Sequence, residues 1–180
     1  MKLSDYINKC LENEEFSYYW NSDDIHVEDI NNVSYDNLWE TLDSIADDEL
    51  LNIIKDRGLK SNIDVPTTIE YYETNTSSPV EEFLNSITDQ KLKTKTLKSI
   101  VALAVQGNDA RPLLSKHVDE GIFELRTKQS SNITRIFYFF IFGNKIILTN
   151  GYVKKSQERD KKEFKKAKQY RNDYLSTLYR

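Results

Sequence analysis

The chain has 180 residues, of which 38% are apolar, 12% aromatic and 30% charged, and its 25 basic and 29 acidic side chains give a formal charge of −4. This composition can supply a hydrophobic core and differs from that of disordered or low-complexity chains, so we expect a globular protein. A single cysteine, Cys10, excludes an internal disulfide and a cysteine-based structural zinc site.

Two features of the chain predict an intracellular, cytoplasmic protein. The longest apolar run, residues 136–142, is far shorter than the roughly 20 residues that cross a bilayer. Acidic side chains interrupt the first 15 positions, where a signal peptide needs a continuous apolar stretch. We therefore expect no action at a membrane.

Charge is divided unevenly along the chain. Residues 1–64 carry 16 Asp and Glu against 5 Lys and Arg, whereas residues 65–180 carry 13 against 20. Nine of these cations lie between Lys154 and Arg171. Such asymmetry is typical of a protein whose basic part binds a polyanion, although a lysine-rich helix with a solvated face has the same composition.

The first 60 residues are predicted to form an acidic, helical accessory domain. Apolar residues recur at helical spacing over Leu3–Leu11. Ser34 is a suitable N-cap for a second helix, and Gly58 is suited to end a third. The periodicity then lapses, so we place the domain boundary here and begin the second domain at residue 65.

Residues 65–180 are predicted to follow the order β, α, α, β, β, β, α. A strand at 67–73 precedes a short helix capped by Ser78 and a longer helix over 89–106. Three strands follow, at 121–128, 133–142 and 145–152, the last two joined by a Gly143-Asn144 turn. The last helix, 158–178, is expected to bury Phe164, Ala167, Tyr170, Tyr174 and Leu178. The domain is therefore expected to be α+β, with a small antiparallel-rich sheet, two helices before it and one after it. The middle strand of the three is apolar throughout, as a central strand would be.

Basic residues from separate strands are expected to meet on one face of this sheet. Arg126 lies on the first of the three strands, Arg135 begins the second, and Lys154 and Lys155 follow the third. Cations beside an aromatic surface suit a phosphodiester, because they bind the phosphate while rings stack on the bases. Arg and Lys near strand ends also serve simply to protect sheet edges, and the residues alone leave both interpretations open.

Four ordered motifs resemble a known family. They are LLSKHV at 113–118, GIFELR at 121–126, TRIFYFF at 134–140 and IILTNGYVKKSQ at 146–157. In order and spacing they resemble phage-derived, HigB-type toxins of the RelE/ParE superfamily, over residues 66–175. The resemblance implies a RelE-like fold in a type II toxin-antitoxin toxin, an endoribonuclease that cleaves mRNA on the translating ribosome without a metal or other cofactor. It also implies a HigA-like helix-turn-helix antitoxin as protein partner, in a heterotetramer.

The chemistry implied by the resemblance is attack of a ribose 2′-OH on the adjacent phosphate, which leaves a cyclic phosphate and a 5′-OH. Arg126 and Arg135 suit the phosphate, because a guanidinium group is always charged and can bind two oxygens. Lys154 or Lys155 is the expected base, because an amine among other cations loses its proton more readily. Two departures from the family leave the identity of the base open: a Thr-Pro pair before the last helix and a histidine near the C-terminus are both absent.

The remaining candidates are aromatic and basic residues. Tyr152 or Tyr138 is expected to stack on a base or to donate a proton, and Lys116 to bind RNA backbone. His117 can serve as an acid or base or contact RNA, but an ordinary surface histidine is the simpler interpretation. The start of the last helix adds three cations expected to contact RNA, Arg159, Lys161 and Lys162.

Two alternatives remain open. The superfamily also contains ParE-like proteins, so a non-catalytic module that binds a protein partner such as gyrase fits the same motifs. The acidic domain either packs on the toxin domain, where it could widen the antitoxin interface, or covers the basic face as an electrostatic mimic of a polyanion.

Overall fold

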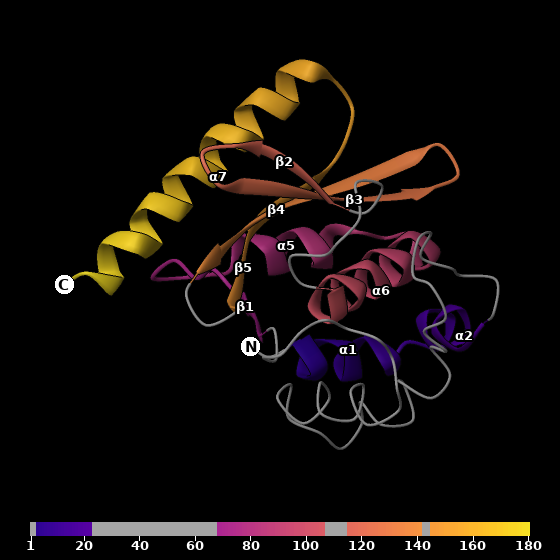
Figure 1. The fold of residues 1–180 in the computed structure, drawn as a ribbon. Coiled ribbons are helices and arrows are strands. Elements are labelled where there is room, and N and C mark those ends of the chain that lie inside the picture. The colour runs from indigo at the N-terminus through magenta and orange to yellow at the C-terminus, as the bar shows by residue number, and fades with distance from the viewer. Residues whose placement is uncertain (1–2, 23–67, 107–114, 142–144) are drawn as a thin grey trace.

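A computed structural model describes residues 3–22, 68–106, 115–141 and 145–180 (Figure 1). These residues form an α+β fold in which helices cover both faces of one five-stranded mixed sheet. In chain order the elements are α1 (Leu3–Leu11), α2 (Glu14–Asn21), β1 (Thr68–Tyr71), α5 (Pro79–Ser86), α6 (Gln90–Gln106), β2 (Ser115–Asp119), β3 (Ile122–Gln129), β4 (Asn132–Ile141), β5 (Lys145–Val153) and α7 (Gln157–Leu178).

The sheet has the strand order β1-β5-β4-β3-β2. Strands β2 to β5 form an antiparallel meander, and β1 adds to β5 in parallel, with Thr68 opposite Lys145. The apolar strand predicted to be central is β4, which has two neighbours on either side in the sheet. β2 was not predicted as a strand, because it is a short edge strand whose residues after Ser115 are exposed and give no apolar alternation.

Local capping sets the beginnings of three helices. Ser78 and Ser156 are the N-caps of α5 and α7, and each side-chain hydroxyl accepts a hydrogen bond from a backbone N–H three residues later. α2 was not predicted; Asn13 caps it by accepting from the Phe16 N–H at 2.9 Å. Its buried residues are limited to Phe16 and Trp20, too few to make its periodicity clear.

The main core lies between one face of the sheet and the helices α1, α2, α5 and α6. Tyr6, Ile7 and Trp20 from the first two helices share this core with Leu97 of α6 and Leu148 of β5. The described part of the acidic segment therefore packs on the same core as the rest of the chain.

α7 covers the other face of the sheet, over β4 and β5 (Figure 1). Ala167 is buried against Phe137, and Tyr170 and Tyr174 pack half-buried on a second small cluster. The prediction that Leu178 is buried is wrong: it is 53% exposed, because α7 continues past Leu175, its last residue in that cluster.

Several predicted features lie outside the described residues: the helix after Ser34, the helix ended by Gly58, the proposed boundary between the domains and the Gly143-Asn144 turn. Within the described ranges, no helix is long and apolar enough to cross a membrane.

Candidate active site

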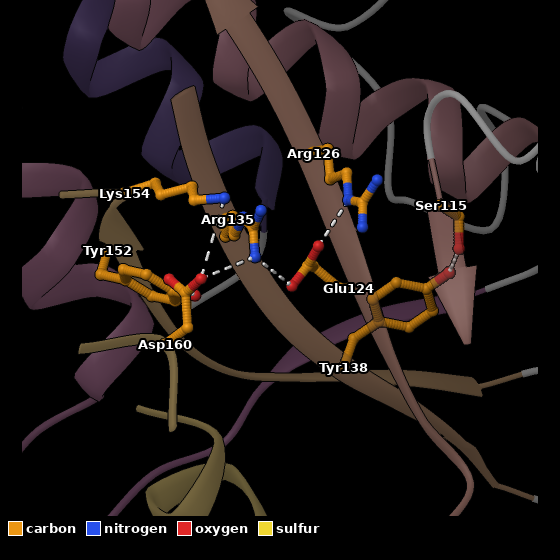
Figure 2. Close-up of polar contacts among 8 residues, drawn as sticks. All are labelled: Ser115, Glu124, Arg126, Arg135, Tyr138, Tyr152, Lys154 and Asp160. Carbon is orange, nitrogen blue, oxygen red and sulfur yellow. Dashed lines mark hydrogen bonds and ion pairs between the residues drawn. The ribbon is translucent and has the colours of Figure 1, made fainter. Parts of the chain in front are cut away.

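The two arginines singled out in the sequence form a direct cross-strand pair. Arg126 of β3 is opposite Arg135 of β4, and Arg135 is in turn opposite Tyr152 of β5. All three project from the sheet face that α7 covers, since alternate residues of a strand share a face and Phe137, two positions after Arg135, packs under α7. As the strand order indicated, the two guanidinium groups meet on one face (Figure 2).

A buried carboxylate lies between these arginines. Glu124, 4% exposed, accepts a hydrogen bond from Arg126 Nε at 2.5 Å on Oε1 and from Arg135 Nη1 at 3.1 Å on Oε2 (Figure 2). Sequence analysis missed Glu124. Its signal was available: a lone acidic residue two positions before Arg126 on an apolar strand must share the face of Arg126.

The first turn of α7 supplies a second carboxylate, which sequence analysis also missed. Asp160 accepts from Arg135 Nη1 at 3.2 Å and from the Tyr152 hydroxyl at 2.8 Å. Lys154 Nζ lies 3.9 Å from Asp160 Oδ2, so Lys154 is on the same face as the arginine pair. Burial, reinforced by the hydrogen bond to Asp160, raises the pKa of Tyr152 well above its usual value, and its hydroxyl stays protonated.

A pocket of about 270 Å³ opens between these strands and the start of α7. Five of the predicted site residues line it, from four different elements: Lys116, His117, Arg126, Arg135 and Lys161. Glu124, Asp160 and three apolar residues complete the lining, namely Val118, Phe137 and Phe164. The pocket therefore combines a cationic wall with an apolar one, as a nucleotide requires.

Tyr138 does not belong to this pocket. It projects from the opposite face of β4, where its hydroxyl pairs with Ser115 and its ring packs between Phe123 and Phe140. Burial raises the pKa of Tyr138 to about 12. The prediction that Tyr138 stacks on a base is wrong for this structure, because its position on β4 alternates away from Arg135.

The stacking role also fails for Tyr152. Its ring is 1% exposed and packs against Phe137, with the ring centroids 6.0 Å apart, so no face is open to a base. His117 borders the pocket, but its ring meets Phe123 edge-on at 5.1 Å, on the side of the sheet away from Arg126. Tyr152 is therefore better understood as a support of the neighbouring structure, whereas His117 is exposed at the edge of the pocket and its predicted contact with RNA stays a prediction.

Three further candidate cations lie beside the pocket without lining it. Lys155, Arg159 and Lys162 are exposed at the end of β5 and the start of α7, and among the described residues their side chains make no ion pair. Farther along α7, Lys166 pairs with Glu163 and Lys168 with Glu120. In the part of the chain that the structure describes, no three His, Cys, Asp or Glu side chains gather as a metal site.

Comparison with protein families shows which family contains the pocket residues. The family model described as Phage derived protein Gp49-like (DUF891) matches residues 82–172, just over half of the chain. The chain belongs to the Gp49-like family. The Gp49-like region runs from α5 into α7 and contains every residue that lines the pocket, whereas α1, α2 and β1 lie outside it. No curated protein matches the chain.

Proposed function

We propose that this Gp49-like protein is a HigB-type toxin, an endoribonuclease that cleaves mRNA on the translating ribosome. The observation that carries the proposal is the arginine pair Arg126–Arg135 in a pocket that also holds Lys116 and Lys161. Together with Lys154 beside Asp160, this site has five cations against two carboxylates. The remaining positive charge suits the phosphate groups of a single RNA strand.

The arginines are suited to stabilise the charge that develops on the phosphate. When the ribose 2′-oxygen attacks phosphorus and the bond to the 5′-oxygen breaks, negative charge grows on the non-bridging oxygens. Preorganised guanidinium donors stabilise such charge more than they stabilise the ground state. Arg126 is suited to this contact because it is 35% exposed and its two Nη groups make no hydrogen bond within the described residues.

Proton transfer is assigned to Lys154 in preference to Lys155. The contact of Lys154 Nζ with Asp160, which itself binds Arg135, places this amine on the face of the arginine pair, whereas Lys155 makes no ion pair within the described residues that would hold it there. In this proposal Lys154 accepts the proton of the 2′-OH, and water supplies the proton of the departing 5′-oxygen. Lys116 and Lys161, which line the pocket from β2 and α7, are positioned to bind flanking phosphates.

A HigA-like helix-turn-helix antitoxin is the proposed partner, in a heterotetramer. An acidic segment of that partner placed over the pocket would compensate the excess of cations and block access of RNA. Co-expression with the neighbouring reading frame and co-purification tests this part of the proposal.

One observation favours the alternative of a non-catalytic, ParE-like binding module. Arg135 is already bound by Glu124 and Asp160, and Arg126 by Glu124. Arginines whose charge is already compensated by carboxylates of the same protein would bind a protein partner as part of a surface rather than react with RNA.

Expression in a bacterial host distinguishes the two functions. We expect growth arrest and new 5′-OH ends within translated codons, both lost in Arg126→Ala. Arg180→Ala, which removes an exposed arginine outside the pocket, is the matched control and should still arrest growth. Growth arrest with DNA-damage signalling and without new RNA ends would contradict the endoribonuclease and favour the binding module.

A further inference from the structure

Glu124 is the only carboxylate of the described residues that binds both arginines of the pair. Its position is unusual, because acidic side chains are rarely buried unless they are paired. Both of its oxygens are used, one for each arginine. A single carboxylate therefore joins β3 and β4 at the centre of the pocket.

The arrangement of the donors shows what this carboxylate does to Arg126. Glu124 takes up Nε, the nitrogen nearest to the backbone, and leaves both Nη groups without an acceptor among the described residues. A guanidinium fixed through Nε has its outer edge directed away from the carboxylate, as Figure 2 shows. That outer edge is the part that binds two oxygens of a phosphate.

Arg135 is held in a different way but by the same residue. Its Nη1 is shared between Glu124 and Asp160, while its buried Nε has no hydrogen-bond acceptor in the described part of the chain. Leaving a buried donor without an acceptor costs about 1–3 kcal/mol. The two carboxylates thus hold Arg135 where one of its own donors, Nε, lacks a hydrogen bond. Such a cost is expected where the position of the side chain matters more than stability.

Electrostatics explains why a carboxylate is needed here. Arg126 and Arg135 are directly opposed across two antiparallel strands, and like charges at such positions destabilise the pair. Without Glu124 the guanidinium groups would separate toward solvent and toward Asp160. The geometry needed for one phosphate would then be lost although both charges remained.

We propose that Glu124 is a positioning residue that sets the spacing and direction of Arg126 and Arg135 for one RNA phosphate. The inference rests on the proposed function and adds a residue to it. Glu124 itself does not contact the reacting atoms; it acts through the two arginines.

Steady-state cleavage of mRNA by the full chain on translating ribosomes tests the proposal. Glu124→Gln keeps the shape but replaces one acceptor oxygen with an amide donor, and Glu124→Asp keeps the charge but is too short to reach both arginines. Both variants are expected to lower kcat by about 100-fold, the cost of misplacing a group by 1 Å, with KM changed less than about 3-fold. The matched control is Glu163→Gln, which removes another buried carboxylate with two partners, Asn150 and Lys166, outside the pocket lining.

The outcomes separate position from charge and from stability. If Glu124 only weakens binding of RNA by its charge, Glu124→Gln will cleave faster and Glu124→Asp will match the wild type, which overturns the proposal. If its role is only structural, Glu163→Gln will lose as much activity as the Glu124 variants at equal thermal stability. The expected result is that kcat falls in both Glu124 variants while the Glu163→Gln control keeps the activity of the wild type.

A second measurement stays valid if the protein does not cleave RNA. In arginine side-chain NMR spectra, the Nε–H of Arg126 is expected to exchange with water about tenfold faster in Glu124→Gln than in the wild type or in Glu163→Gln. Unchanged exchange would overturn the positioning role whatever the function. Faster exchange in a protein without nuclease activity would instead contradict the proposed function alone.

Discussion

Arg126 of β3 lies directly opposite Arg135 of β4, with the carboxylate of Glu124 bonded to both. Two positive side chains at opposed positions are normally unfavourable in an antiparallel sheet. Two opposed arginines around one buried carboxylate therefore indicate a site in which geometry is favoured over the stability of the sheet.

The energetic coupling of this site can be measured. Arg135→Ala leaves Glu124 buried without one of its two cations, and breaking a buried pair in this way costs about 3–5 kcal/mol in the free energy of unfolding. Adding Glu124→Gln should make the double variant more stable than the sum of the two single effects predicts. Urea unfolding of the wild type, the two single variants and the double variant gives a double-mutant cycle. Effects that add to within about 0.5 kcal/mol would contradict the coupling.

Tyr138 predicts a specific loss of stability in alkali. Burial raises its pKa to about 12 in the folded protein, whereas an unfolded tyrosine ionises near pH 10. Between these pH values the unfolded state releases a proton that the folded state keeps, so stability is unaffected below about pH 10 and falls as pH rises toward about 12. The free energy of unfolding measured across this range should fall less steeply in Tyr138→Phe than in the wild type. Identical pH profiles would show that Tyr138 does not remain protonated.

The lysines of the pocket should determine the salt dependence of RNA binding. Lys161 lines the pocket. Lys145 is the first residue of β5, at the end of the strand away from Lys154, and pairs with Glu70. Lys161→Ala should reduce the slope of log K against log salt by about 0.7, the value for one phosphate contact of a single strand. Fluorescence anisotropy with a 2′-O-methyl RNA, which resists cleavage, measures the slope. Lys145→Ala should leave it unchanged, and an equal effect of the two substitutions would place the RNA elsewhere.

A side chain at position 151 is expected to cause a packing defect on the face of β5 that lies away from the pocket. A Cβ atom there would lie 2.2 Å from Cδ1 of Phe83, a ring atom of α5. Gly151→Ala should therefore lower the free energy of unfolding by about 1–3 kcal/mol, as overpacked cores do. Chemical unfolding checks the value, and Phe83→Leu in the same chain should recover part of the loss. A neutral Gly151→Ala would mean that α5 moves away at little cost.

The first two helices offer a test of the role of the acidic segment. Trp20 is 2% exposed in the main core, whereas its neighbour Tyr18 is 67% exposed. Trp20→Ala should cost about 3–5 kcal/mol of stability, and Tyr18→Ala should have little effect on it. Neither should strengthen RNA binding at low salt, because α1 and α2 lie on the side of the sheet away from α7 (Figure 1), and the start of α7 lines the pocket. Tighter binding in either variant would favour an electrostatic cover.

The regular elements of the second half could be predicted because their signals are local. Ser78 and Ser156 are capping residues, and the apolar run of β4 identifies a strand covered on both faces. Edge strand β2 and the short helix α2 lack such patterns. Their positions depend on contacts with distant residues, such as the packing of Trp20 in the main core, that a sequence window does not contain.

The candidate site could be predicted in its cations but not in its carboxylates. Strand order was enough to place Arg126 beside Arg135. Glu124 and Asp160 went unnoticed because acidic residues do not suggest phosphate binding on their own; their role follows from the arginines that they bind. The roles of Tyr138 and Tyr152 were assigned without knowing which face of the sheet each would occupy and how deeply, which depends on register and on the cover provided by α7.

The composition of the pocket has a consequence during synthesis. Asp160, Lys161 and Phe164 come from α7, which follows all five strands of the described sheet along the chain. Protein synthesis delivers N-terminal segments first, so a nascent chain with a finished sheet still lacks one wall of the pocket. Under the proposed function, the nascent chain would therefore be unable to cleave the mRNA of the ribosome that is making it until α7 has emerged.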